Sequence, residues 1–340
     1  MTLIRFVMVA AALLLGSYAG AQTLSATPTA SDVAAAKAAA SRIIQPMPAN
    51  TPAGATLKEA NHSAINTPPT TPFRGGGPRY PADLSFQGGP SVGQAKSHAI
   101  YITHGSCTTP GCWGDPEGFL QSLAGSNFIH VTDQYVGRYD NNRYTVGGHV
   151  SGTFDPYPTV PLTDQNMLAV VHAVASGTGQ TGYGHIFHVF LAPGTDECFD
   201  ASFTTCYSPD KPSTFFFCAY HGSVDFSDIG HVLYTVEPYQ NVPGCNVAPG
   251  SPNGSLIDST ASVLSHETFE TITDPDGSAW WNAESNSLFG SEIGDECAFI
   301  IFLPSGVYFD PPAFKIGGKT YAVQSEYSNA GHSCATSPDN

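Results

Sequence analysis

Residues 258–275 read DSTASVLSHETFETITDP, and this stretch predicts an amphipathic helix. Asp258 or Ser259 can cap its N-terminus, because short polar side chains accept hydrogen bonds from the first free backbone N–H groups. The helix must end near Thr273, since the residue before Pro275 resists the helical conformation. Small and apolar residues at helical spacing form one stripe that can face a core. This stripe consists of Ala261, Leu264, Thr268 and Ile272.

The same helix carries a histidine and two glutamates in the pattern H-E-x-x-E. His266 and Glu270 are four residues apart and therefore share a helix face, away from the apolar stripe. In the H-E-x-x-H motif of zinc peptidases, two ligands at this spacing bind the metal and the intervening Glu activates a water molecule. A carboxylate oxygen is also a zinc ligand. We therefore predict that His266 and Glu270 bind one Zn2+ per chain and that Glu267 is the general base. The alternative is an exposed helix face without metal.

A catalytic zinc site needs a third protein ligand and one open position. Candidates lie in residues 291–297 (SEIGDEC), which a disulfide at Cys297 would hold in place. We prefer Glu292 as the third ligand, with Asp295 as the alternative. Asp274 is expected to cap the turn at residues 274–277 instead. Zn2+ is the predicted metal, although carboxylate-rich sites discriminate less among divalent cations than thiolate sites do.

A second group of candidates follows a predicted strand, in residues 218–223 (CAYHGS). Tyr220 and His221 are predicted to act in catalysis by donating a hydrogen bond to a substrate carbonyl or to a developing oxyanion. The alternative is a histidine at the end of a strand that makes only a structural hydrogen bond.

Strand and helix patterns alternate along residues 96–340. Strand composition is found at residues 98–103, 128–131, 185–191, 215–220 and 231–236. Helical spacing is found at residues 115–123 and 162–175, and a hairpin is expected at residues 313–323 around Gly317-Gly318. We therefore predict an α/β fold, with a single mixed-sheet domain, flanking helices, a zincin-like active helix and disulfide-stabilised loops.

The N-terminal part of the chain differs from this domain. Residues 1–21 are expected to be a signal peptide, with Arg5, an apolar run over 6–16 and the small residues Ala19-Gly20-Ala21; an uncleaved anchor is the alternative. No later run approaches about 20 apolar residues, so we expect no membrane span after signal removal. Residues 22–95 have the composition of an Ala/Pro-rich leader or linker, and a propeptide is the alternative.

Eight cysteines all follow residue 106, and their even number in an exported chain predicts disulfides. The absence of a C-x-x-C pair in the sequence argues against a zinc ribbon. We expect a secreted, extracellular or periplasmic protein. The preferred pairing is 107–112, 198–206, 218–245 and 297–334.

Composition narrows the classes of partner. The 340 residues include 12 Lys and Arg against 28 Asp and Glu, which gives a net charge of −16 and no basic cluster. Polyanion binding needs such a cluster, so we expect no nucleic-acid partner. Abundant Gly (35) and Pro (27), with 41% hydrophobic residues, are typical of a loop-rich globular protein.

The order of several segments resembles the phosphate-induced protein 1 family, which includes the plant EXORDIUM proteins, and especially its microbial secreted members. The matching segments are HAIYITHGS (98–106), FIHVTDQYVG (128–137), VPLTDQNMLAVVHAV (160–174), HIFHVFLAPGTDE (185–197), FFFCAYHGS (215–223), SVLSHETFETITDP (262–275) and EIGDEC (292–297). The resemblance covers residues 95–336 and implies an EXORDIUM-like α/β domain over 96–340. It also implies an association with the cell wall.

Two functions are therefore expected as alternatives. The first is a secreted, zinc-dependent peptidase, a hydrolase that acts on polypeptide substrates through Glu267. The second is a non-catalytic extracellular protein that binds cell-wall carbohydrate or a surface partner, as the resemblance to the plant proteins implies. An aromatic content of 11% and the incomplete H-E-x-x-H motif support the second.

Overall fold

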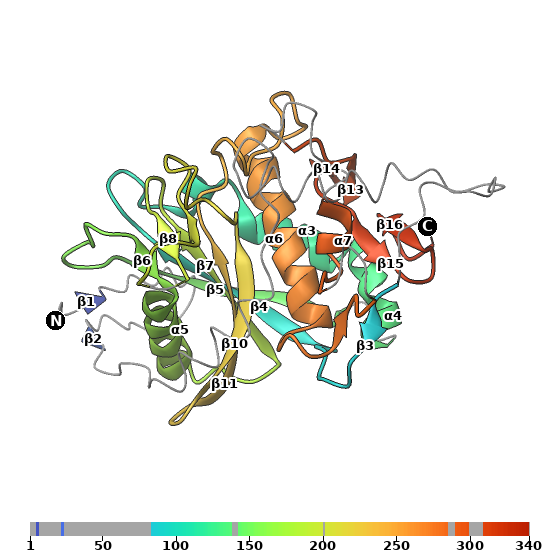
Figure 1. The fold of residues 1–340 in the computed structure, drawn as a ribbon, viewed down its shortest axis with the longest axis horizontal. Coiled ribbons are helices and arrows are strands. Elements are labelled where there is room, and N and C mark those ends of the chain that lie inside the picture. The colour runs from blue at the N-terminus through green and yellow to red at the C-terminus, as the bar shows by residue number, and fades with distance from the viewer. Residues whose placement is uncertain are drawn as a thin grey trace.

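A five-stranded mixed sheet with helices on both faces forms the centre of the fold (Figure 1). The computed structural model describes residues 83–137, 142–199, 201–284, 290–298 and 309–339, together with the backbone of residues 5–6 and 22–23. The sheet has the order β10-β11-β7-β4-β5. Its strands are β4 (Ala95–Ile102), β5 (Tyr144–Gly152), β7 (His185–Leu191), β10 (Tyr220–Phe226) and β11 (Gly230–Glu237). Only the β10–β11 pair is antiparallel within this sheet.

One helix covers one face of the sheet and two cover the other. Helix α5 (Asp164–Thr178) packs on β7 and β11, whereas α3 (Pro116–Ala124) and α6 (Ser255–Thr273) lie against the opposite face. Figure 1 shows α5 and α6 on either side of the sheet. Two separate apolar clusters result, as expected for a sheet buried on both faces. The α/β prediction is therefore confirmed at the level of mixed helix and sheet.

Short elements complete the layers. The helical ones are η1 (Pro110–Trp113), η2 (Phe128–Thr132), α4 (Asp133–Val136) and α7 (Asp295–Ala298). The paired strands are β1 (Arg5–Phe6) with β2 (Gln22–Thr23), β3 (Ser85–Phe86) with β12 (Trp280–Trp281), β13 (Ala313–Ile316) with β14 (Lys319–Ala322), and β15 (Glu326–Ser328) with β16 (Ser333–Ala335). A three-stranded sheet contains β6 (Leu162–Thr163), β8 (Glu197–Cys198) and β9 (Cys206–Tyr207).

Helix α6 is longer and more deeply buried than its sequence predicts. It begins at Ser255, one turn before the expected caps, and ends at Thr273 as expected. Every residue from Asp258 to Thr273 is buried, so the alternative of an exposed helix face is wrong. The reason is tertiary packing: β10 and β11 cover one side of α6, and α3 and β14 cover others.

Two predicted strands need correction, and one strand was missed. Residues 128–131 form the 3-10 helix η2, because a short apolar run does not by itself distinguish a buried strand from a buried helical turn. Strand β10 begins at Tyr220, where the predicted strand 215–220 was expected to end. Strand β5 was not predicted, since its sequence YTVGGHVSG contains three glycines. The hairpin at 313–323 is confirmed, and both Gly317 and Gly318 have positive φ, 58° and 90°.

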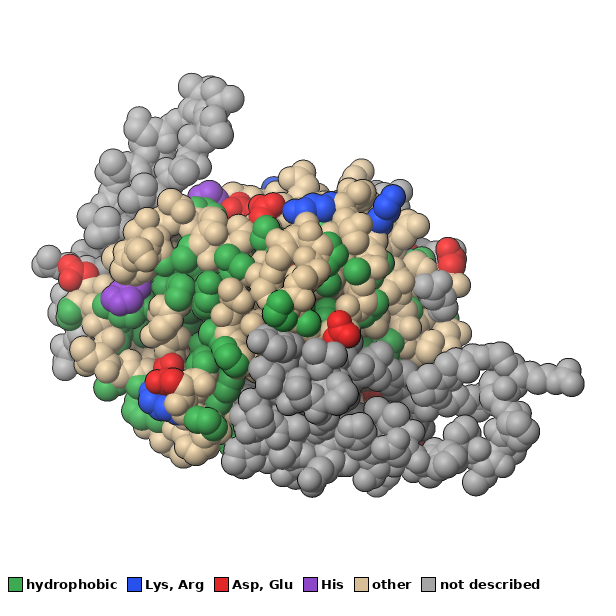
Figure 2. All heavy atoms as spheres, turned by 90° about the horizontal axis from the view of Figure 1, so that it is seen from above, with side chains coloured by type: hydrophobic (Ala, Val, Ile, Leu, Met, Phe, Trp, Pro, Cys, Tyr) green, Lys and Arg blue, Asp and Glu red, His purple; other side chains and the backbone are tan. Residues whose placement is uncertain are grey.

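The four expected disulfides are all present: Cys107–Cys112, Cys198–Cys206, Cys218–Cys245 and Cys297–Cys334. Such bonds persist in oxidising compartments, so they fit a secreted or extracellular protein. In the part of the chain that the structure describes, no helix has the length and apolar character needed to cross a membrane. Figure 2 shows a face on which uncharged groups cover most of the described surface.

The packed domain begins before the expected boundary at residue 96. Leu84 and Val92 are buried, and β3 pairs with β12. Residues 83–94 therefore belong to the domain rather than to the leader. Of the expected signal peptide, only the backbone of residues 5–6 falls within the described residues, and residues 24–82 of the expected leader lie outside them.

Candidate metal centre

Three segments that are far apart in the sequence meet between the sheet and α6. Strand β10 contributes His221. Its register partner on β11 is Thr235, and both residues lie on the sheet face that packs against α6. Helix α6 contributes His266, Glu267 and Glu270. Residues 290–298 contribute Glu292 and Asp295, and the Cys297–Cys334 disulfide ties this segment to the C-terminal strands. All of these side chains are buried.

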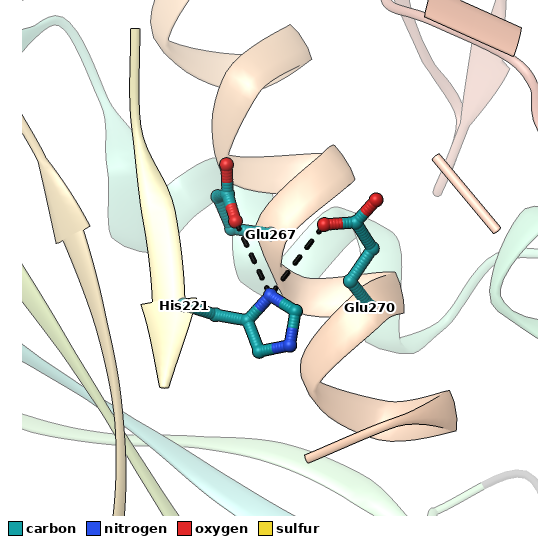
Figure 3. A group of neighbouring side chains, drawn as sticks. All are labelled: His221, Glu267 and Glu270. Carbon is teal, nitrogen blue, oxygen red and sulfur yellow. Dashed lines mark ion pairs between the residues drawn. The ribbon is translucent and has the colours of Figure 1, made fainter. Parts of the chain in front are cut away.

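Glu270 lies at the centre of the group because its two oxygens face different histidines. Its Oε1 is 3.0 Å from Nε2 of His266, and its Oε2 is 3.5 Å from Nδ1 of His221. Glu267 approaches the same nitrogen, with Oε2 3.5 Å from Nδ1 of His221. Figure 3 shows the His221 ring extending from β10 toward the two carboxylates of α6.

The position of residues 290–298 favours Asp295 over Glu292 as the third ligand. Oδ1 of Asp295 lies 3.7 Å from Nε2 of His266, and its backbone N–H donates to Oε1 of Glu270 at 3.2 Å. Glu292 lies on the other side, with Oε2 3.6 Å from Nε2 of His221. Two sets of ligand atoms each lie within 4.8 Å of one another. They are His266–Glu270–Asp295 and His221–Glu267–Glu270.

The cluster carries far more negative than positive charge. Seven buried carboxyl groups surround the two histidines: Glu237, Glu267, Glu270, Asp274, Glu292, Asp295 and Glu326. Within the described ranges, the ion pairs of these carboxylates involve histidine and neither Lys nor Arg. Taking a carboxylate out of water costs several kcal/mol unless an opposite charge compensates it. The group therefore favours bound protons or a bound cation.

The pKa values reflect this competition. Burial alone would raise the pKa of Glu270, but the two histidines lower it to about 2. Burial likewise acts to lower the pKa of His221, but the neighbouring carboxylates of Glu267 and Glu270 raise it to about 9. Burial and neighbouring carboxylates raise the pKa of Glu292 well above its ordinary value, and burial raises that of Asp295 in the same way.

Several ligand atoms in the cluster have no hydrogen-bond partner among the described residues. They are Nδ1 of His221, Nε2 of His266, both oxygens of Glu267, Oε2 of Glu270, Oε2 of Glu292 and Oδ1 of Asp295. Buried polar atoms are nearly always paired, and each unpaired one costs about 1–3 kcal/mol. Because these atoms converge, either added protons or one bound cation can satisfy several of them together.

Two neighbours fix the orientation of His266. Nε2 of Gln324 lies 3.0 Å from Nδ1 of His266 and also donates to the carbonyl of Gly294 at 2.6 Å. Gly294 itself packs directly on the ring, since a Cβ atom there would lie 2.5 Å from Nδ1. Only a glycine allows this approach of the backbone.

Tyr220, which we expected in the site, lies on the opposite face of β10. Adjacent strand residues point to opposite faces, so Tyr220 and His221 cannot both face α6. The Tyr220 hydroxyl instead lies 2.9 Å from Oδ1 of Asp164 and 3.1 Å from Oε1 of Glu197, beneath α5, and shares its proton with these two carboxyl groups. Asp274 forms the expected turn cap, with Oδ1 accepting from the N–H groups of Ser278 and Ala279.

Three polar residues around the cluster were not identified from the sequence. Glu237 ends β11, Glu326 lies in β15 and Gln324 precedes that strand. A signal was present for Glu237, because an acidic residue closes the apolar run GHVLYTVE. For Glu326 and Gln324 the sequence contains no pattern that indicates burial.

Comparisons with known protein families, with curated proteins and with solved structures find no match to this chain. The resemblance to the phosphate-induced protein 1 family therefore stays a prediction from the order of motifs. The functional argument depends on the site.

Proposed function

We propose that the protein is a secreted, metal-dependent peptidase in which His266, Glu270 and Asp295 bind a divalent cation and Glu267 is the general base. The observation that carries this proposal is the convergence of buried, unpartnered ligand atoms on one side of α6. Imidazole nitrogen and carboxylate oxygen are both zinc ligands, and a catalytic zinc site uses three protein ligands. The two carboxylates also balance the charge of one divalent cation.

In this proposal the cation, Glu267 and the neighbours of His266 have different roles in peptide hydrolysis. A cation at this position would polarise a peptide carbonyl and acidify water. Glu267 follows His266 directly on α6, and both of its oxygens are without a hydrogen-bond partner within the described part of the chain. Such a carboxylate can accept a proton and return it to the leaving amine. Gln324 and Gly294 hold the His266 ring against rotation.

A second candidate is the non-catalytic extracellular protein that binds cell-wall carbohydrate, in which a cation at this site would be structural. The full burial of His221, His266, Glu267 and Glu270 favours it, because structural metal sites are closed whereas catalytic ones keep an open position. A cavity of about 500 Å³ away from the cluster is lined by Tyr157, Val160, Asp196 and Lys211, among others. Its size fits a small polar ligand such as a sugar.

The peptidase proposal is tested on protein purified without chelators or nickel affinity resin. We expect about one equivalent of zinc or more by elemental mass spectrometry, and less in His266→Ala. Glu267→Gln should cleave denatured protein substrates about 100- to 10,000-fold more slowly than wild type. Asp225→Asn is the control, because it removes an exposed carboxylate from β10.

Equal cleavage by Glu267→Gln and wild type would refute the role of the base. A wild-type protein that holds zinc but cleaves no peptide would support the second candidate. Zinc-free wild-type protein after dialysis against Zn2+ would refute the metal site.

A further inference from the structure

The ring of His221 is oriented like that of a metal ligand. Its Nε2 lies 3.2 Å from the backbone carbonyl of Asp274, and a carbonyl only accepts hydrogen bonds, so Nε2 carries the proton. The other nitrogen, Nδ1, faces Oε2 of Glu267 and Oε2 of Glu270, each at 3.5 Å. A cation between these atoms would displace the proton of Nδ1 and bind its lone pair. Three possible ligand atoms thus converge on one point.

The partner at Nε2 strengthens this interpretation. Histidines that bind metals usually donate their other ring N–H to a carbonyl or carboxylate, which fixes the tautomer and the orientation of the ring. The Asp274 carbonyl is well placed to do so, because the Asp274 N–H donates to the carbonyl of Glu270 and its side chain caps the following turn. The ring, the turn and the end of α6 therefore form one rigid unit.

Glu270 belongs to both sets of ligands. Its Oε1 faces His266 and Asp295, and its Oε2 faces His221 and Glu267. A carboxylate that presents one oxygen to each of two ligand sets has the arrangement of a bridging ligand. In two-metal sites the ions lie about 3.5–4 Å apart, a separation that one carboxylate spans.

We infer that Glu270 bridges two divalent cations, the second of which is bound by Nδ1 of His221, Oε2 of Glu267 and Oε2 of Glu270. This inference rests on the proposed first cation at His266, Glu270 and Asp295. Charge supports it, because the buried carboxyl groups around the two histidines exceed the two negative charges that one divalent cation balances. One imidazole with two carboxylates in each set is a donor set for Zn2+, Mn2+ or Fe2+.

The second cation changes the role of Glu267. In the one-cation arrangement Glu267 binds no metal, so replacing it leaves the metal content unchanged. In the two-cation arrangement Oε2 of Glu267 is a ligand, and its Oε1 remains the atom that can accept a proton. The metal content of a Glu267 variant therefore separates the two arrangements independently of activity.

The test is equilibrium dialysis of the full chain against Zn2+ alone, followed by elemental mass spectrometry. We expect two equivalents in wild type and one in both Glu267→Gln and His221→Gln, because each variant removes a ligand of the second cation only. Tyr220→Phe, on the opposite face of the same strand, is the matched control and should retain two. Circular dichroism and urea unfolding establish that each variant is folded.

A measurement on the wild type does not depend on the folding of any variant. After loading with two equivalents of Mn2+, the electron paramagnetic resonance spectrum should show a magnetically coupled pair rather than two isolated ions. One equivalent of Zn2+ in wild type, retained in Glu267→Gln and His221→Gln, would overturn the second cation and leave the proposed function intact. Loss of that single equivalent in His266→Gln would identify the first site. No zinc in wild type would overturn both.

Discussion

Gly294→Ala disturbs the candidate metal centre without changing any ligand. A methyl group at this position would lie 2.5 Å from Nδ1 of His266, whereas ordinary contacts begin at 3.4 Å. Either the ring or residues 290–298 must therefore move by about 0.9 Å. Metal–ligand distances tolerate only about 0.2 Å. The displacement would change the distance between Nε2 of His266 and Oδ1 of Asp295, which is 3.7 Å.

We expect two measurable effects. Overpacking should lower the free energy of unfolding by about 1–3 kcal/mol. Misplacing the His266 ring should weaken Zn2+ binding at the set formed with Glu270 and Asp295 by about 10- to 100-fold, the range found when groups that orient metal ligands are replaced. Urea unfolding of the metal-free protein gives the first quantity, and competition with a zinc chelator gives the second.

Gly148→Ala is the control, because a Cβ atom at this site of β5 meets no atom within 4 Å. It should leave zinc affinity unchanged. If Gly294→Ala binds Zn2+ as tightly as wild type and unfolds at the same urea concentration, then residues 290–298 do not pack against His266 as described. The assignment of Asp295 as the third ligand would fall with that contact.

Three further changes test the surroundings of the site. Burial, followed by the charge of His98, lowers the pKa of His188 from 6.5 to about 3. Between pH 6.5 and 3 the unfolded chain therefore binds a proton at His188 that the folded chain does not, and the free energy of unfolding falls as the pH drops. His188→Leu should flatten the dependence of unfolding free energy on pH by up to about 1.4 kcal/mol per pH unit in this window, as urea titrations would measure; an unchanged slope contradicts the shift. Replacing Cys297 and Cys334 together by Ala opens a link across 37 residues and should cost about 4 kcal/mol by calorimetry, and equal stability would rule out that contribution. Tyr220→Phe removes hydrogen bonds to two buried carboxylates and should cost about 1–3 kcal/mol in urea unfolding without altering zinc content; altered zinc content would contradict its place outside the cluster.

The features that local sequence fixes were predictable. The helical end at Thr273 follows from Pro275, and the turn cap at Asp274 follows from its Asp-Pro-Asp-Gly context. The i, i+4 spacing of His266 and Glu270 brings their side chains together at 3.0 Å, as the motif indicates. Each of these relations involves residues within one or two turns of one another.

The features that depend on tertiary packing were not predictable. No property of α6 itself indicates that its polar face is buried, because that depends on β10 and on residues 290–298 arriving from elsewhere. Whether Glu292 or Asp295 lies nearer to His266 depends in the same way on how residues 290–298 pack against α6. The prediction that Tyr220 and His221 share one site was wrong, because both lie in β10 and adjacent strand residues face opposite sides of the sheet. The predicted strand ended at residue 220, so this alternation was not applied to His221.

Residues 83–94 limit where proteolytic maturation can cut the chain. Asp83 accepts a hydrogen bond from the hydroxyl of Tyr327 at 2.9 Å, Leu84 is buried, and the Val92 N–H donates to the carbonyl of Ile272 near the end of α6. A cut within this segment would strip β3 from β12 and expose the end of the helix that carries the candidate ligands. Any processed form that keeps these contacts must therefore begin at or before Asp83.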